Sequence, residues 1–275
     1  VRPYEVQPGS ADAMTDRWSQ KLVDGFQAGK GMNRRQMRAN FDEICSSFAA
    51  IPVAGDPKIR VGVVGEIYVK FAPLGNNNLE QFLLSEGVEP VVPGLTDFII
   101  FKIYNRVADV ELYGGKWIKK AGCSLFMKYV EACQRDMIAA LEQSGRFRAP
   151  GTFQDLHSMV QGYLGDGNKM GEGWLLTAEM LELIHTGTNN IVCAQPFGCL
   201  PNHIVGKGMI RKLKDDYPYS NIVAIDYDPG ATRINQENRI KLMLANARGL
   251  IHQEPVRPRE EPHVERQPQL AHANI

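Results

Sequence analysis

Cys199 is set apart from the other cysteines of this chain by the segment around it, Gln195-Pro-Phe-Gly-Cys-Leu-Pro-Asn-His203, which follows the apolar stretch 190–194. The pattern predicts a strand that ends near Pro196, a turn that presents the thiol, and a helix that begins near Pro201. Such a thiol lies at the carboxyl end of a strand and beside the positive end of a helix dipole. Both features favour the thiolate, the form that binds metal or attacks an electrophile. The alternative is a small buried thiol that packs the turn.

His203 follows Cys199 by four residues, near the start of the predicted helix. Its imidazole is suited to donate a hydrogen bond to a cluster sulfide or to a substrate carbonyl, and the alternative is that it caps the helix. A further hypothesis makes Cys199 a nucleophile with His203 as its base, although the sequence offers no third group to orient the pair.

The other four cysteines form no recognisable metal motif. Cys193 lies inside the predicted strand and Cys45 at a helical core position, while the ten-residue interval between Cys123 and Cys133 matches no zinc or ferredoxin spacing. An odd number of thiols also argues against a disulfide framework. A [4Fe-4S] cluster needs about four sulfur or substitute ligands. Any cluster bound by Cys199 would therefore take its remaining ligands from outside this chain.

A second group of polar residues lies late in the predicted strand 58–69 and in the loop after it. Glu66 comes late in this predicted strand, where a charged carboxylate is costly unless it is paired, and the loop Asn76–Asn78 then leads into a helix. The free N–H groups of that helix could meet a phosphate or a carboxylate, so we interpret Glu66, Asn76 and Asn77 as ligand contacts. The alternative is a capped helix with Asn as the N-cap and Glu66 paired with a Lys or Arg. The segment is neither GxGxxG nor a P-loop, so nucleotide binding is not indicated.

Two further segments have weaker signals. Asp226 ends the apolar stretch 221–225 and is interpreted as a buried pairing partner, with a position in the cleft near Cys199 as the alternative. The segment 162–174 contains five glycines, which suits either a mobile lid or a plain surface connection.

These residues need a scaffold that brings strand ends together. Apolar, β-branched segments at 58–69, 89–94, 190–194 and 221–228 alternate with segments of helical periodicity. Repeated β-then-α units predict an α/β fold with a doubly wound, mainly parallel sheet. The carboxyl ends of parallel strands share one edge, where open sheets bind their ligands.

The sequence divides into three parts. Residues 1–50 are expected to form a helical segment that packs on the core. Residues 51–250 are expected to form the α/β domain, with a helical insertion at about 96–187. Residues 251–275 contain four prolines among charges, and we expect a disordered tail.

Composition excludes some classes of function. The chain has 31 Lys and Arg residues and 31 Asp and Glu residues, so it has no excess positive charge to hold a nucleic acid. No apolar run approaches the length of about 20 residues that a membrane helix needs, and the first residues form no signal peptide. We therefore expect a cytoplasmic protein without membrane or nucleic-acid partners. Residue 1 is Val, which suggests a piece of a longer polypeptide or a non-standard start.

Several of these segments together resemble the carboxyl-terminal region of proteins related to 2-hydroxyacyl-CoA dehydratases and their activators, including the large activase-related proteins. The likeness extends over residues 1–247 and is carried by Val61-Gly-Val-Val-Gly-Glu-Ile-Tyr-Val69, Pro73-Leu-Gly-Asn-Asn-Asn78, Gln195-Pro-Phe-Gly-Cys-Leu-Pro-Asn-His203, Ile225-Asp-Tyr-Asp-Pro-Gly-Ala231 and Asn235-Gln-Glu-Asn-Arg239.

The resemblance implies Rossmann-like or flavodoxin-like domains and an oxygen-sensitive iron-sulfur cluster that three cysteines hold. In the family an ATPase activator delivers a low-potential electron to this cluster, and related members carry a double-cubane cluster and perform ATP-dependent reductions under anaerobic conditions. Cys199 matches the family's last cluster cysteine. Glu66, Asn76, Asn77, Gln195 and His203 would then shape the cleft around cluster and substrate.

The chain departs from the family in lacking both an earlier cysteine motif and an ATPase phosphate loop. We therefore expect a fragment or a truncated gene product that keeps the last cluster ligand. The amino-terminal part of the parent protein, or a second copy in a homodimer, would supply the others. The alternative function is a non-catalytic docking or regulatory domain for an activator ATPase.

Overall fold

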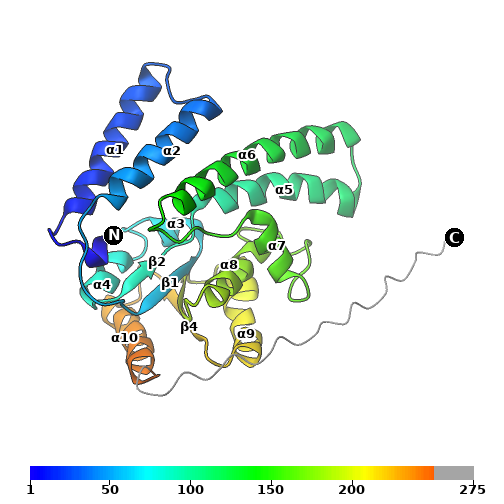
Figure 1. The fold of residues 1–275 in the computed structure, drawn as a ribbon. Coiled ribbons are helices and arrows are strands. Elements are labelled where there is room, and N and C mark those ends of the chain that lie inside the picture. Colours follow the sequence, from blue (N-terminus) through cyan, green and yellow to red (C-terminus); the bar gives the residue numbers. More distant parts are fainter. Residues whose placement is uncertain (251–275) are drawn as a thin grey trace.

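A four-stranded parallel sheet forms the centre of the computed structural model, which describes residues 1–250 (Figure 1). The strand order is β2-β1-β3-β4, and the strands are β1 (Arg60–Gly65), β2 (Glu89–Val91), β3 (Asn190–Pro196) and β4 (Asn221–Tyr227). The predicted α/β class with a parallel sheet is confirmed, and the architecture is consistent with a Rossmann-like fold. The tail predicted at 251–275 lies outside the described residues.

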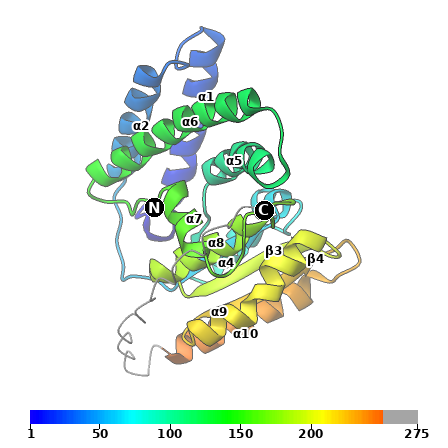
Figure 2. The same ribbon diagram turned by 90° about the vertical axis from the view of Figure 1, so that its right-hand side faces the viewer.

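Helices surround the sheet and extend away from it on one side (Figure 2). In chain order they are η1 (Arg2–Tyr4), α1 (Ser10–Gln27), α2 (Arg34–Ala49), α3 (Ile67–Phe71), α4 (Leu79–Ser85), α5 (Leu95–Tyr113), α6 (Trp117–Gln143), α7 (Phe153–Val160), α8 (Trp174–His185), η2 (Asn202–Gly206), η3 (Lys207–Met209), α9 (Ile210–Asp216) and α10 (Arg233–Leu250). Across the described part of the chain, no helix has the length and apolar character needed to cross a bilayer.

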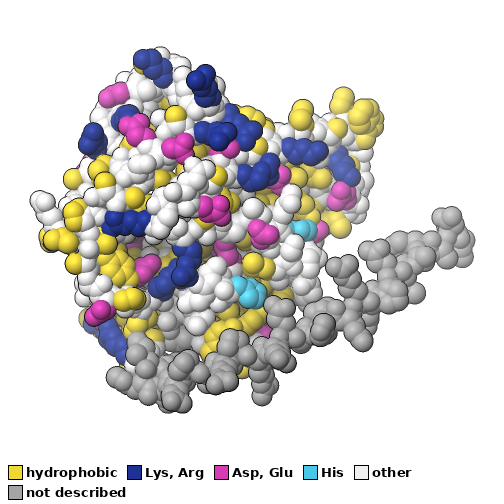
Figure 3. Space-filling model, viewed as in Figure 1, with side chains coloured by type: hydrophobic (Ala, Val, Ile, Leu, Met, Phe, Trp, Pro, Cys, Tyr) yellow, Lys and Arg dark blue, Asp and Glu magenta, His cyan; other side chains and the backbone are white. Residues whose placement is uncertain are grey.

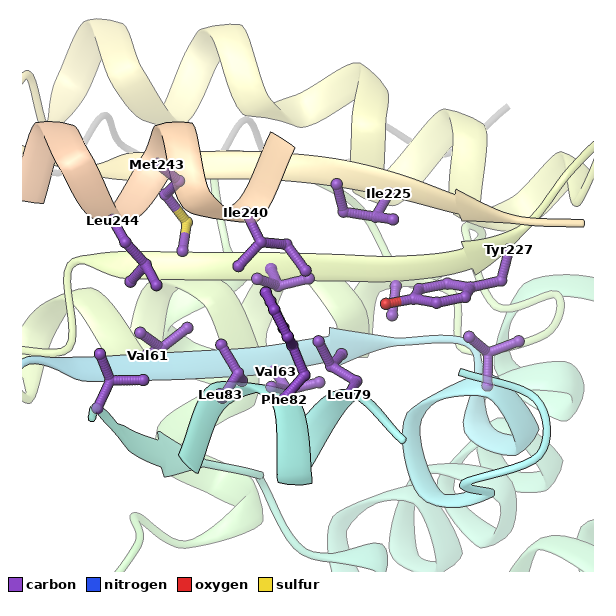
Figure 4. Packing of buried hydrophobic residues seen from close by; sticks show 14 residues of the cluster. Val61, Val63, Leu79, Phe82, Leu83, Ile225, Tyr227, Ile240, Met243 and Leu244 are labelled. Atoms are coloured by element: carbon purple, nitrogen blue, oxygen red, sulfur yellow. The ribbon is translucent and has the colours of Figure 1, made fainter. Parts of the chain in front are cut away.

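One face of the sheet is covered by α4 and α10. Val61 and Val63 of β1 pack there against Phe82 of α4, and Ile225 of β4 packs in the same cluster as Ile240 of α10 (Figure 4). Because side chains alternate along a strand, the residues between these face the other layer.

The opposite face is covered by α8, η2 and α9. Cys193 of β3 and Ala224 of β4 are buried there with Leu181 and Leu213. Strand residues are apolar on both faces, as expected for a parallel sheet that is buried on both sides. Helices therefore cover both faces of the parallel sheet.

Two helical hairpins, α1–α2 and α5–α6, lie beside the sheet, and α2 packs on α6 (Figure 1). Arg34, the first residue of α2, binds Asp136 of α6. The third apolar cluster joins α5 and α7 to α8, with the rings of Phe101 and Trp174 in edge contact at 5.0 Å. Within the predicted insertion 96–187, α8 differs from the other helices because it packs directly on the sheet.

β4 is an edge strand of the sheet. The N–H of Asn221 donates toward β3, to the carbonyl of Asn189 at 2.8 Å, so the backbone groups of Ile222 and Ala224 face away from β3. A groove of about 520 Å³ follows this edge between α9 and α10. Its lining includes the cationic side chains Lys207, Arg211, Lys214 and Arg239.

Candidate functional site

Cys199 lies in the turn that follows β3, at the carboxyl edge of the sheet. Gly198 has a φ of 74°, and the N–H of Cys199 donates to the carbonyl of Pro196 at 3.2 Å, which turns the chain directly after the strand. The carbonyl of Cys199 then accepts from the N–H of His203 at 3.0 Å, so Cys199 caps the helical segment that follows. Its side chain is half-buried, between the exposed residues Phe197 and Leu200.

The helical segment after Cys199 contains a π-helical turn, η2, which follows the α-helical residues 200 and 201. Such turns are rare and are found frequently at functional sites. Gly206 at its end lets the turn lie close to the sheet and α8, because a Cβ there would come within 2.8 Å of Leu176 and 3.1 Å of Sγ of Cys193. The start of this segment is therefore fixed by packing against α8.

The imidazole of His203 lies beside the Cys199 turn. Its Nδ1 is 2.8 Å from the carbonyl oxygen of Cys199, and its Nε2 is 4.0 Å from Oδ1 of Asp226. The ring therefore links the backbone of the cysteine turn to a carboxylate on β4. Among residues 1–250 no hydrogen bond joins the Cys199 thiol to this imidazole, so the structure does not show the nucleophile–base pair considered from the sequence.

Gln195 and Asp226 form the polar centre of this edge. The Nε2 of Gln195 donates to Oδ1 of Asp226 at 2.6 Å, and Nζ of Lys207 is 3.8 Å from Oδ2 of the same carboxylate. Gln195 is fully buried, and its Oε1 has no hydrogen-bond partner among residues 1–250. A buried amide oxygen of this kind is a position that an ordered water can satisfy. The structure thus brings together Gln195 and His203, two of the predicted site residues, around Asp226.

Asn77 is connected to Asp226 by two consecutive hydrogen bonds through Gln236. Its Nδ2 donates to Oε1 of Gln236 at 2.8 Å, and Nε2 of Gln236 donates to the carbonyl oxygen of Asp226 at 3.0 Å. Asn77 adopts a left-handed φ of 54°, which an Asn tolerates better than most residues. The loop after α3 is therefore connected to the end of β4, and its amide serves an internal hydrogen bond.

Glu66 and Asn76 satisfy backbone groups near them. The carboxylate of Glu66 accepts from the N–H of Val69 at 2.8 Å and so caps α3. The buried side chain of Asn76 donates to the carbonyl of Val69 at 2.8 Å and accepts from the N–H of Leu79 at 3.1 Å. The capping alternative holds only in part. Asn76 accepts a bond from the first residue of α4, but the N-cap residue Asn78 makes no side-chain cap, and Glu66 makes no ion pair within residues 1–250. The structure does not bring these two side chains into the group around Asp226.

β1 and β3 are neighbours in the sheet, but the chain leaves them on opposite faces. The connection after β1 passes through α4 on one face, and the connection after β3 passes through α9 on the other, so the carboxyl ends of β1 and β3 form the switch point of the sheet. Open α/β sheets bind ligands in the crevice at this position. The two backbones approach closely there, because a Cβ on Gly65 would lie 1.8 Å from the carbonyl oxygen of Ala194. Only glycine fits at this position.

Two side chains that the sequence did not single out hold the switch point together. The buried carboxylate of Glu172 accepts from the N–H of Ile67 at 3.1 Å. With its amide oriented by its hydrogen-bond partners, the buried Asn202 donates to Glu172 at 2.9 Å and accepts from the N–H of Glu66 at 3.0 Å. The glycine-rich segment 162–173 is thereby joined to the helix that follows Cys199.

Buried charges lie behind this edge. Nζ of Lys70 is 2.8 Å from Oε1 of Glu179, and both side chains are almost fully inaccessible. Burial raises the pKa of Glu179, and it raises the pKa of Asp97 to about 6 and that of Glu182 to about 7. The sequence does contain a signal for part of this group, because Glu179 and Glu182 interrupt an otherwise apolar helix. Charged residues in such a helix are expected to be paired.

Only one thiol reaches the sheet edge. Cys193 is fully buried under α8 and η2, and burial raises its pKa to about 12. Cys45 is buried in α2, and Cys123 and Cys133 belong to α6. Among residues 1–250 no three His, Cys, Asp or Glu side chains come together as a metal site. Cys199 fits the role of a single ligand, so a cluster would need further ligands from elsewhere.

Comparison with known proteins gives no relative: no family model, no curated protein and no solved structure matches this chain. A function for the protein therefore has to be argued from the residues at the carboxyl edge of its sheet.

Proposed function

We propose that this chain is the carboxyl-terminal α/β domain of an iron-sulfur, low-potential electron-transfer enzyme of the 2-hydroxyacyl-CoA dehydratase-related group, with Cys199 as a cluster ligand. The observation that carries this proposal is the position of Cys199, half-buried in a helix-capping turn at the switch-point edge of a doubly wound sheet. The reaction class is an ATP-driven dehydration or reduction with a partner activase, in the cytoplasm.

Residues beside the thiol support a site that a neighbour completes. Phe197, Leu200 and Ile204 are large apolar side chains that are exposed around Cys199. Exposed apolar residues in one place mark a surface that another protein part covers. A cover of this kind would exclude water from a cluster, which is one of the factors that set its reduction potential. The remaining ligands would come from the amino-terminal part of the parent protein or from a second copy.

When bound, the cluster would supply one-electron transfer to the substrate. The residues of this chain have supporting tasks: His203 holds the backbone of the Cys199 turn, and Asp226 with Lys207 fixes the orientation of Gln195. Gln195 would support the cleft from below, because its buried Oε1 is a position that an ordered water can satisfy.

Anaerobic reconstitution of the full-length natural protein with ferrous iron and sulfide tests the ligand role. We expect Cys199→Ala to lose most of the bound iron and the EPR signal of the reduced cluster. Cys123→Ala is the matched control, because Cys123 is a half-buried thiol on α6, and it should keep both. Equal iron content in the Cys199→Ala protein and the wild type would overturn the ligand role.

The second candidate is a non-catalytic docking or regulatory domain for an activator ATPase. It is favoured by the presence of a single thiol at the sheet edge in residues 1–250. Pull-down of this chain with the ATPase component separates the two functions. Docking would be established in place of cluster binding by two results together. The iron-free chain and the Cys199→Ala variant would bind the ATPase equally strongly, and the full-length protein would bind no iron.

A further inference from the structure

The amino-terminal half of α6 carries large apolar side chains that residues 1–250 leave uncovered. Trp117, Ile118 and Leu125 are 77%, 65% and 73% exposed, and Phe126 and Tyr129 are exposed as well. Figure 3 shows apolar side chains gathered at the end of the α5–α6 pair that lies farthest from α1 and α2. Monomeric proteins seldom expose so many large apolar residues on one helix.

These residues form a stripe rather than a scattered patch. Ile118, Gly122, Leu125 and Tyr129 follow one another at intervals of four, three and four residues, which places them on one face of the helix. A Cβ on Gly122 would have no neighbour within 4 Å, so the middle of the stripe is open to the close approach of another backbone. A stripe with this spacing is the surface into which a second helix packs.

Further along α6, the same stripe is already occupied by a helix. Asp136 lies seven residues beyond Tyr129 on the same face, and it accepts from Arg34 of α2 at 2.9 Å. Arg34 also donates to the carbonyl of Ala132 at 3.4 Å. We call residues 117–129 of α6 the bare half of this helix. Because α2 begins at Arg34, its packing on α6 ends where the bare half starts, as Figure 1 shows. A further helix would continue the existing α2–α6 packing.

Charges at the border of the bare half are positive. Lys116, Lys119 and Lys128 are exposed, and none of them makes an ion pair within the described chain. The nearby Lys120 is neutralised by Glu111 at 2.8 Å. An incoming helix that carried acidic residues beside its apolar stripe would complement this border.

We propose that the bare half of α6, from Trp117 to Tyr129, is the docking site for an amphipathic helix of a partner protein whose apolar stripe is flanked by Asp and Glu. A second copy of this chain is disfavoured, because two α6 helices would bring Lys119 and Lys128 of both copies together. A bilayer surface is disfavoured because the α1–α2 hairpin projects past α6 in both views, so a flat surface would meet that hairpin first (Figures 1 and 2).

The chain contains its own reporter for this test. Trp18 and Trp174 are buried, whereas Trp117 is exposed at the start of α6 beside the stripe, so a shift in tryptophan emission on titration reports events at α6. The probes are two 18-residue helical peptides with leucines at three- and four-residue spacing, one flanked by Glu and the other by Lys. We expect the Glu-flanked peptide to shift the emission to the blue and to bind at least tenfold more tightly than the Lys-flanked peptide.

Variants of the stripe and its border make the test specific. Leu125→Glu should weaken binding of the Glu-flanked peptide at least tenfold, and the double variant Lys119→Glu/Lys128→Glu should reverse the preference between the peptides. Leu242→Glu is the matched control, since Leu242 is 65% exposed on α10 and lies outside the stripe. All substituted side chains are exposed, so circular dichroism should show unchanged folding.

Three outcomes would overturn the proposal. The first is equal or absent binding of the two peptides. The second is a dimer of the wild-type chain in analytical ultracentrifugation that Leu125→Glu dissociates, which would make a second copy the occupant. The third is co-sedimentation of the chain with phosphatidylserine–phosphatidylcholine vesicles that Leu125→Glu abolishes, which would make a lipid surface the occupant. The result is independent of cluster binding, because Cys199→Ala should bind the Glu-flanked peptide like the wild type.

Discussion

Gln195 and Asp226 face each other in the β3–β4 register, and Nε2 of Gln195 lies 2.6 Å from Oδ1 of Asp226. The other polar atom of the amide, Oε1, is buried and without a partner among residues 1–250. One amide thus binds a carboxylate through its donor, while its acceptor receives no hydrogen bond from the described chain. Both features can be tested by substitution.

Gln195→Glu should be less stable than Gln195→Met at pH 8. The new carboxylate would be buried beside Asp226, which we expect to lower the free energy of unfolding by about 3 kcal/mol, whereas Met loses only a hydrogen bond, at about 1 kcal/mol. At pH 5 a protonated Glu can donate to Asp226, so the difference should shrink. Urea denaturation at the two pH values measures this, and a Glu variant as stable as the wild type at pH 8 would contradict it.

The thiols should differ in their reaction with Ellman's reagent. In the folded chain we expect Cys199, Cys123 and Cys133 to react, because they are half-buried, while Cys193 is fully buried with a raised pKa and reacts only on unfolding. Cys199→Ala should remove one reactive thiol from the native count. An unchanged native count in that variant would show that the Cys199 thiol is inaccessible.

Glu172→Ala should loosen the glycine-rich segment. The substitution removes the acceptor for the N–H of Ile67 and for Asn202, and we expect an unfolding free energy lower by about 2 kcal/mol. Trypsin should then cleave faster after Lys169, which lies in this segment and binds Asp109 in the folded chain. Glu142→Ala, at an exposed position on α6, is the control. Identical cleavage rates in both variants would show that Glu172 does not hold the segment.

Stability should fall as pH rises from about 4 to 6, in part because of Asp97. Burial raises its pKa to about 6, so over this range the folded chain holds a proton that the unfolded chain has released. The loss amounts to about 3 kcal/mol when complete. Asp97→Asn keeps an acceptor for Gln134 and should flatten the profile, whereas Asp56→Asn, at an exposed position, should not. Thermal unfolding across pH 4–8 measures the slopes, and equal slopes in the Asp97→Asn protein and the wild type would refute the effect.

The strand after Lys58 shows how far local pattern could predict the fold. The pattern predicted a strand up to Val69, but β1 ends at Gly65. Residues 67–69 are of types that favour strands, yet they form a helix. The backbone turns at Gly65, where φ is 140°, and the carboxylate of Glu66 accepts from the N–H of Val69 and so caps the helix. A side-chain cap and a close backbone contact outweigh the β-propensity of three residues.

The candidate site was predicted in part for a similar reason. Turn residues near Cys199 could be predicted from their order in the chain, because Pro, Gly and Asn act on the backbone next to them. The partner of Asn77 is Gln236, and that of Glu172 is Asn202, both distant in the sequence. Polar side chains in a loop indicate hydrogen bonding, but the partner depends on how the sheet brings separate segments together.

The cationic groove along β4 has a consequence for the behaviour of the protein in solution. An edge strand whose backbone groups face outward is a template for the edge of another molecule, and such contacts can propagate into aggregates. The groove is lined by four cationic side chains and one carboxylate, Asp215, so two sheets that approach edge to edge would bring an excess of positive charge together. Their mutual repulsion opposes pairing between two molecules along the exposed edge of β4. Because salt shortens the range of this repulsion to about 3 Å at 1 M, the chain is best kept dispersed at low ionic strength.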